Sequence, residues 1–226
     1  MSALVRRVLE AARAGLGQVP EFDLRAGASD ALLAAVEAEI GYALPRDVRE
    51  LYLAHDGQEA DGVGFFFGWR FDPLAVALAN WRIERDAYGH RRADWCRRVG
   101  EEGGTGILVR RRVRESISSP RWFPLCSLSG HTGIYADSDP ADDGIEGQIV
   151  IAGNEVLEPD AYADSLAGFL ASMEHAIRRG SVTVGRDADG RATWGIGPAA
   201  ASIDEYRDLF VASGRDWLAR IDSACA

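Results

Sequence analysis

The chain contains no lysine, and all 25 of its basic residues are arginine. It has only three cysteines, Cys96, Cys126 and Cys225, and no apolar run approaching the ~20 residues of a membrane-spanning helix. An odd number of widely spaced cysteines does not form a disulfide framework and favours reduced thiols. Arg6 and Arg7 interrupt the apolar residues near the start, so the hydrophobic region of a signal peptide is missing. These absences predict a cytoplasmic protein without a membrane span.

Linker sequences are also missing. The 226 residues are 47% hydrophobic, which is enough for a substantial core, and no Pro/Ser-rich or low-complexity stretch separates two halves. We therefore expect one domain that carries additional segments.

Combinations of residues that carry catalysis or hold a cofactor are absent or incomplete. The four histidines, His55, His90, His131 and His175, show no zinc-binding spacing. The run Gly103–Gly106 is not followed by the Lys-Ser/Thr of a phosphate-binding loop. Cys126 lies between leucines, a setting typical of a small buried side chain rather than a nucleophile. The sequence thus predicts no enzyme, no catalytic residues and no cofactor.

Charge is sorted sharply along the chain. Residues Trp122–Ile177 contain ten acidic residues and no basic one, whereas Arg82–Arg121 contains eleven arginines against six acids. The net charge of the whole chain is −10 and its pI is about 4.9. Such sorting is typical of a protein that meets a charged partner. We expect the arginines to pair with the protein's own acids or to support self-association.

Nucleic acid is a poor partner for this chain. Arg110–Arg112 and Arg114 resemble a basic patch, but a net negative charge opposes attraction to phosphate. The alternation of an expected strand at Ile107–Val113 would also divide these arginines between two faces. The sequence predicts no nucleic-acid partner.

The acidic loop, residues Asp137–Glu146, was tested as a calcium site. A calcium-binding EF-hand loop that starts at Asp137 requires Asp or Asn, Gly and Glu at its fifth, sixth and twelfth positions. Those positions hold Ala141, Asp142 and Gln148, so no metal site is expected. The loop can be a solvated turn or a surface for a basic partner, and both interpretations stay open. Its candidate partner-binding residues are Asp137, Asp139, Asp142, Asp143 and Glu146.

Hydrophobic periodicity predicts helices near both ends and strands in the middle. Ser29 or Asp30 can begin a helix that Gly41 ends, Pro45 suits the start of the next, and Asp164 can begin a third that ends at Gly180. Phe65, Phe67, Trp69 and Phe71 alternate, which predicts a strand with an aromatic face. Phe65 and Trp69 are candidates for an interface centre, although burial in the core is the favoured interpretation of such a face. Further strands are expected at Gly133–Asp137 and Gln148–Ile151, a hairpin at Val182–Trp194, and a terminal helix after Ser202.

Two segments carry short motifs in a fixed order. The first, Ala31–Gly57, has an acidic helix, Gly41, Leu44-Pro45 and a second helix with Tyr52. The second has Trp122-Phe-Pro124, the turn Asp137-Ser-Asp139-Pro140 and Gly147-Gln148-Ile149. The order and spacing fit over roughly Asp30–Gly180. In these motifs the chain resembles the SUKH superfamily, whose members include fungal cell-wall assembly regulators and bacterial immunity proteins of polymorphic toxin systems.

The resemblance implies a SUKH-like α+β fold, a single domain with a mainly antiparallel sheet and helices packed around it. We expect the domain at 29–195, with an insertion near 82–106 and helical extensions at 1–28 and 196–226. The functional expectation is an immunity protein that sequesters a cognate toxin, for example a basic nuclease. The alternative is an intracellular regulatory adaptor like the fungal members; a small-molecule or nucleotide-acting enzyme is a third, weaker hypothesis. The sequence leaves the oligomeric state open.

Overall fold

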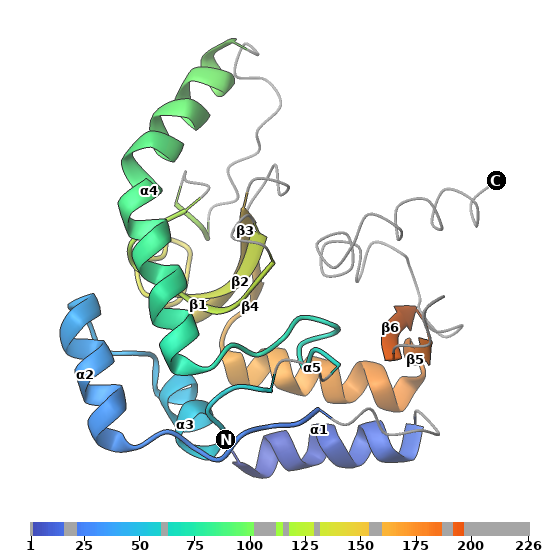
Figure 1. Ribbon diagram of the computed structural model, residues 1–226. Coiled ribbons are helices and arrows are strands. Elements are labelled where there is room, and N and C mark those ends of the chain that lie inside the picture. Colours follow the sequence, from blue (N-terminus) through green and yellow to red (C-terminus); the bar gives the residue numbers. More distant parts are fainter. Residues whose placement is uncertain are drawn as a thin grey trace.

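A computed structural model describes residues 2–15, 22–59, 63–101, 112–114, 118–128, 132–153, 160–186 and 192–196 (Figure 1). Along the chain the elements are α1 (Ser2–Gly15), α2 (Asp30–Ile40), α3 (Arg46–Ala54), α4 (Leu74–Glu101), β1 (Trp122–Leu128), β2 (Thr132–Asp137), β3 (Gln148–Gly153), β4 (Asp160–Ala163), α5 (Leu166–Arg179), β5 (Val182–Arg186) and β6 (Ala192–Ile196).

The central sheet is an antiparallel meander in the order β1-β2-β3-β4. Successive side chains along each strand point to opposite faces of the sheet, and both faces contribute buried residues. One face contributes Phe123, Ile134 and Ile149 to the main core. The other contributes Trp122, Tyr135 and Val150 to a smaller cluster that Val113 completes. The structure confirms the predicted α+β class with an antiparallel sheet.

Local signals for the helix ends are confirmed to within a residue. Ser29 caps α2 by accepting a hydrogen bond from the Leu32 amide at 3.2 Å, and Gly41 ends the helix with φ +80°, a left-handed conformation that favours glycine. Pro45 precedes the first residue of α3. The cap of α5 is Ser165 rather than the expected Asp164, because the Ser165 hydroxyl reaches the Gly168 amide at 3.0 Å.

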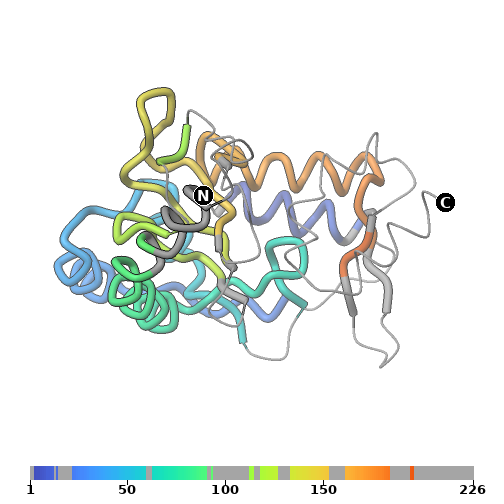
Figure 2. Tube along the Cα trace, turned by 90° about the horizontal axis from the view of Figure 1, so that it is seen from above, coloured from blue at the N-terminus to red at the C-terminus, as the bar shows by residue number. Residues whose placement is uncertain are grey.

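Helix α1 is part of the main core rather than an appendage. Its apolar stripe, Val5, Val8, Ala11 and Ala12, is at most 1% exposed. Figures 1 and 2 both place α1 beside α5, and Arg7 forms a 2.9 Å ion pair with Glu174 of α5. The predicted N-terminal helix is therefore present, and it stabilises the domain by covering α5.

The prediction of an aromatic strand over Phe65–Phe71 is wrong. Residues 63–71 form a compact turn with two isolated bridges, Gly64 with Gly68 and Phe66 with Trp69. Its aromatic side chains, Phe65, Phe66, Phe67, Trp69 and Phe71, are all at most 1% exposed, whereas Gly68 and Arg70 face solvent. The alternation that suggested a strand arose because nearly every side chain in this loop enters the core.

Other expectations fall partly outside the described residues. Most of the expected strand Ile107–Val113 lies outside them, and Arg112–Arg114 forms a turn and bend. The hairpin is confirmed, since β5 pairs antiparallel with β6 as a separate two-stranded sheet. The expected terminal helix after Ser202 lies outside the described residues. The insertion expected near 82–106 is largely the continuous helix α4, which extends past the sheet in Figure 1. No helix in the described ranges combines the length and hydropathy needed to span a bilayer.

Candidate interaction surface

Asp137, the first acid of the acidic loop, is a structural residue. It is fully buried at the end of β2 and lies opposite Gln148 in the sheet register. One carboxylate oxygen accepts from the Asp139 amide at 2.8 Å and the other from the Gln148 side-chain amide at 2.8 Å. Burial raises the pKa of the Asp137 carboxyl above its ordinary value. As a candidate partner-binding residue Asp137 is contradicted, since no partner can reach it in this fold.

The remaining acids of the loop are accessible to different degrees. Asp139 is partly exposed and forms a 3.0 Å ion pair with Arg114. Asp142, Asp143 and Glu146 are exposed at the tip of the loop. Among the described residues, no arginine lies within ion-pairing distance of Asp142 or Glu146. The surface that a partner can meet is therefore the second half of the loop.

Phe65 and Trp69 lie in the core, at 0% and 1% exposed. The Gln58 side chain holds their loop closed. Its carbonyl oxygen accepts from the amides of Phe65 and Phe71 at 2.7 and 2.9 Å, while its NH₂ group donates to the carbonyls of Phe22 and Val63. The proposal that these aromatics form an interface centre is wrong, and the alternative that they are core is confirmed.

The two family-like motifs meet in space. Gly147 adopts φ +85°, and a β-carbon added there would lie 3.0 Å from Cβ of Pro45. Beside this contact the surface is hollowed by about 550 Å³ between the starts of α1, α3 and α5 and the end of the acidic loop. The apolar lining consists of Leu4, Ala43, Leu44, Pro45 and Ala167, and the charged lining of Arg46, Asp47, Glu50 and Glu146.

Asp47 joins two of these helix starts. Its Oδ1 accepts from the amide of Val48 at 2.9 Å, and its Oδ2 accepts from the amide of Ala167 at 2.8 Å. A carboxylate at a helix N-terminus satisfies amides that have no intrahelical acceptor and complements the helix dipole. Sequence reasoning missed Asp47 and Glu50, because they are about 100 residues from Glu146 in the chain. The sequence feature that could have located the hollow is the pair of motifs Leu44-Pro45 and Gly147-Gln148, which lie in contact beside it.

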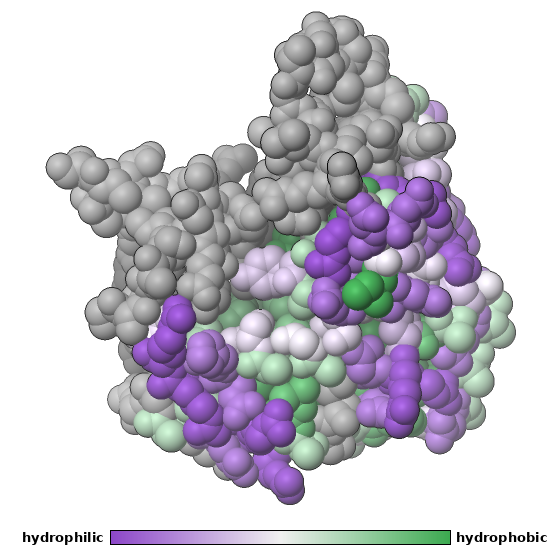
Figure 3. All heavy atoms as spheres, turned by 180° about the vertical axis from the view of Figure 1, so that it is seen from behind, coloured by the Kyte–Doolittle hydropathy of each residue, from purple (hydrophilic) through white to green (hydrophobic). Residues whose placement is uncertain are grey.

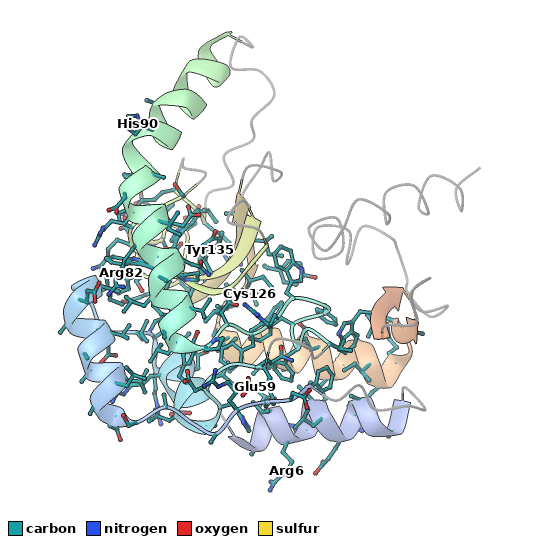
Figure 4. The ribbon with its side chains drawn as sticks, viewed as in Figure 1. Arg6, Glu59, Arg82, His90, Cys126 and Tyr135 are labelled. Carbon is teal, nitrogen blue, oxygen red and sulfur yellow. The ribbon has the colours of Figure 1, made fainter. Side chains whose placement is uncertain are left out.

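Four arginines of the basic segment pair with the protein's own acids, as expected: Arg82, Arg85, Arg112 and Arg114. Arg82 on α4 reaches both carboxylate oxygens of Glu39 on α2, at 2.6 and 2.7 Å (Figure 4). This hydrogen bonding lowers the pKa of Glu39. Arg112 pairs with Asp164, and Arg121 stacks 4.4 Å from the ring centre of Tyr42. Ion pairs of Arg112 and Arg114 with acids of the segment Trp122–Ile177 thus neutralise part of the charge of both segments.

The structure also shows the surroundings of Cys126 and His55, which the sequence analysis weighed as a nucleophile and as a zinc ligand. Cys126 is buried in the sheet, and burial raises the pKa of its thiol well above the ordinary value, so it is a small core residue as predicted. His55 follows the last residue of α3, with Nδ1 at 3.2 Å from the carbonyl oxygen of Arg25. Within the described ranges, no group of three or more His, Cys, Asp or Glu residues could hold a metal ion. The absence of a metal or cofactor in the working protein remains a prediction.

Exposed apolar side chains do not gather into a large patch. Among the described residues the large exposed ones are Leu32, Leu53, Ile83 and Ile145, which come from four different elements or loops. The face turned away from the viewer of Figure 1 shows two hydrophilic areas separated by a paler band of apolar and near-neutral residues (Figure 3). A surface of this kind suits a polar, charge-guided contact rather than a wide apolar interface.

The antiparallel sheet, its covering helices and the contact between the two motifs define an α+β domain of the SUKH type. The chain belongs to the SMI1/KNR4 family (SUKH-1), whose sequence model matches residues 27–172. It is similar to a KNR4/SMI1 homolog of Yarrowia lipolytica, 26% identical over 204 residues, which cover 73% of this chain and 28% of the relative. It is also similar to the cell wall biosynthesis/cell cycle regulator smi1 of Schizosaccharomyces pombe, 27% identical over 168 residues, 71% of this chain and 33% of the relative. The chain thus spans a third or less of the length of these relatives.

Proposed function

We propose that this protein is a non-enzymatic regulator that acts by binding a protein partner. The observation that carries the proposal is the exposed acidic surface, Asp142, Asp143 and Glu146, beside a hollow formed where the family's two motifs meet. The names of the two relatives, one of them a cell wall biosynthesis/cell cycle regulator, support a regulatory role. They fit the adaptor alternative better than the immunity function that the sequence resemblance first favoured.

The chemistry of the described residues also supports a binding function. The buried titratable groups are used in structure: Asp137 holds a turn, and Cys126 is packed inside the sheet. Asp47 and Glu50, at the hollow, are engaged with helix amides and with Arg46 respectively. A nucleophile beside a base, which would indicate covalent catalysis, does not occur at this surface.

Affinity capture followed by reconstitution tests this proposal. The tagged full-length chain is expressed in its native cells, its partner is identified after cross-linking, and the two purified proteins are mixed. We expect a defined stoichiometric complex whose association slows as salt rises, because exposed charges are screened over ~8 Å at physiological ionic strength. Turnover of a substrate by the isolated chain, without a stable protein complex, would refute the proposal.

An immunity function is a second candidate, because the exposed carboxylates of the acidic loop suit a basic toxin such as a nuclease. A toxin gene immediately upstream would support it. The test is co-expression with that neighbouring protein: wild-type chain should restore growth, and a variant with Asp142, Asp143 and Glu146 reversed to arginine should do so poorly at equal abundance. If neither rescues growth, the immunity function is excluded for that pair.

A further inference from the structure

We infer that the hollow between α1, α3, α5 and the acidic loop is the docking site for an extended, basic segment of the partner protein, in which arginine or lysine alternates with apolar residues. This inference rests on the proposed function and specifies the chemistry of the partner. It combines three observations: the place of the hollow beside the acidic loop, its lining by apolar and acidic residues, and the hydrogen bonds already made at the starts of α3 and α5.

The lining of the hollow divides by chemistry. Leu4, Ala43 and Pro45 offer apolar surface that is still partly or fully accessible. Asp47, Glu50 and Glu146 contribute three carboxylates, against the guanidinium of Arg46 and the N-terminal ammonium group, both of which hydrogen-bond Glu50. Arg46 is itself engaged with Glu50 at 2.8 Å and is 92% exposed, so it projects into solvent. A segment that presents apolar side chains to the floor and cations to the rim complements both parts.

An anion is a worse fit, although helix N-termini ordinarily attract anions. At α3 and α5 three of the amides that an anion could use already have an acceptor within the protein. Val48 and Ala167 donate to the carboxylate of Asp47, and Gly168 donates to the hydroxyl of Ser165. The positive ends of the two helices are thus partly neutralised within the protein, and the three carboxylates outnumber the two cations at the hollow.

The acidic loop extends this surface. Asp142 and Asp143 are exposed a few residues before Glu146, and Ile145 between them and Glu146 is 49% exposed. The loop is anchored by buried groups: Gln148 binds the Asp137 carboxylate and donates to the carbonyl of Arg112 at 2.7 Å. A fixed loop with charged and apolar side chains can hold one partner conformation at a small entropic cost.

The test uses three synthetic octapeptides: alternating arginine and leucine, alternating glutamate and leucine, and arginine with glycine. The full-length ¹⁵N-labelled chain is titrated with each, and amide NMR shifts are followed. We expect the arginine–leucine peptide to move the amides of Leu44, Gly147 and Ala167, with weaker effects from arginine–glycine and none from glutamate–leucine. No change at these amides, or an equal response to the acidic peptide, would overturn the inference.

Two variants separate the contribution of the negative charge to peptide binding from that of the open space in the hollow. Glu146→Lys should weaken binding by about threefold to fivefold, the size expected of one partly exposed charge, and the loss should shrink in high salt. Ala43→Trp fills the exposed floor without changing charge and should abolish binding. The matched control is Glu59→Lys, a 66% exposed acid outside the hollow, which should leave the affinity unchanged. Melting curves confirm that all three variants fold; equal weakening by Glu59→Lys would show only a general charge effect.

The fate of the partner complex distinguishes this inference from the proposed function. If Ala43→Trp and Glu146→Lys still form the reconstituted complex with wild-type affinity, the partner binds elsewhere and the inference fails while the binding function stands. If no protein complex forms with the wild-type chain, the proposed function fails. If the chain forms a dimer that buries the amides of Leu44, Gly147 and Ala167, and peptide binding appears only when the dimer dissociates on dilution, the hollow is a self-association surface and the inference is overturned.

Discussion

Asp47 at the start of α3 accepts a hydrogen bond from the backbone amide of Ala167 at the start of α5, with 2.8 Å between Oδ2 and the nitrogen. The two residues are 120 positions apart in the sequence. One carboxylate therefore accepts from an amide near the start of each of two helices and links them beside the hollow.

Replacing Asp47 with alanine should lower the free energy of unfolding by about 1–3 kcal/mol, because two helix-terminal amides lose their acceptor. Urea unfolding measures the change. Asp142→Ala on the exposed loop is the control and should have an effect within about 0.5 kcal/mol. Equal small effects for both variants would show that solvent replaces the Asp47 caps.

Replacing Gln58 with leucine should lower the free energy of unfolding by at least ~3 kcal/mol, because four buried backbone groups lose their partners at once. Those groups are the carbonyls of Phe22 and Val63 and the amides of Phe65 and Phe71. The neighbouring exposed Glu59→Leu serves as control in the same urea titration. A stable Gln58→Leu variant would contradict the role of this side chain in closing the aromatic loop.

Trp122→Ala should lower the free energy of unfolding by ~3–5 kcal/mol, as for other large-to-small aromatic changes in cores. Trp122 is 2% exposed and its ring centre lies 5.8 Å from that of Tyr135. Trp122→Phe, which keeps most of the packing, should cost less. Thermal unfolding gives the comparison, and an unchanged melting temperature in the alanine variant would mean that the second cluster contributes nothing.

Val8→Asp tests whether α1 belongs to the core. The side chain is 0% exposed, and an unpaired carboxylate there should destabilise the domain by several kcal/mol, about 3 or more. By contrast, Arg7→Ala removes a half-exposed ion pair and should cost about 1 kcal/mol or less. Limited proteolysis reports both changes. If Val8→Asp frees only α1 while the sheet stays resistant, α1 folds onto a domain that is stable without it.

The buried Asp137 carboxyl predicts a pH effect. Burial raises its folded-state pKa, so in the folded protein it should titrate above the ordinary value of 3.8. The folded state then binds more protons than the unfolded state between the two pKa values. Its contribution to the free energy of unfolding is therefore largest below 3.8 and falls as pH rises through the folded-state pKa. A carboxyl-carbon NMR titration measures the midpoint; a value at or below 3.8 would contradict this assignment.

The local elements could be predicted from the sequence because their determinants are local. Ser29, Gly41 and Gly180 set helix ends through neighbouring amides and carbonyls, and strand alternation is visible at Gly133–Asp137 and Gln148–Ile151. The aromatic run Phe65–Phe71 misled the same reasoning. Period-two alternation cannot distinguish a strand with one buried face from a loop whose side chains are nearly all buried.

The sequence predicted where the candidate site lies in the chain, but not which of its residues are exposed. The charge pattern identified the acidic loop, yet it could not separate Asp137, which hydrogen-bonds inside the fold, from Asp142 and Glu146, which face solvent.

The amino-acid sequence by itself determined the ends of α2 and α5, the start of α3, the α+β class and the family, because these depend on residue order and on spacing along the chain. Only the tertiary structure decided which acids are exposed, that α1 is part of the core, and that Pro45 meets Gly147 beside a hollow. These properties depend on contacts between segments about 100 residues apart, and such contacts follow from packing rather than from local periodicity.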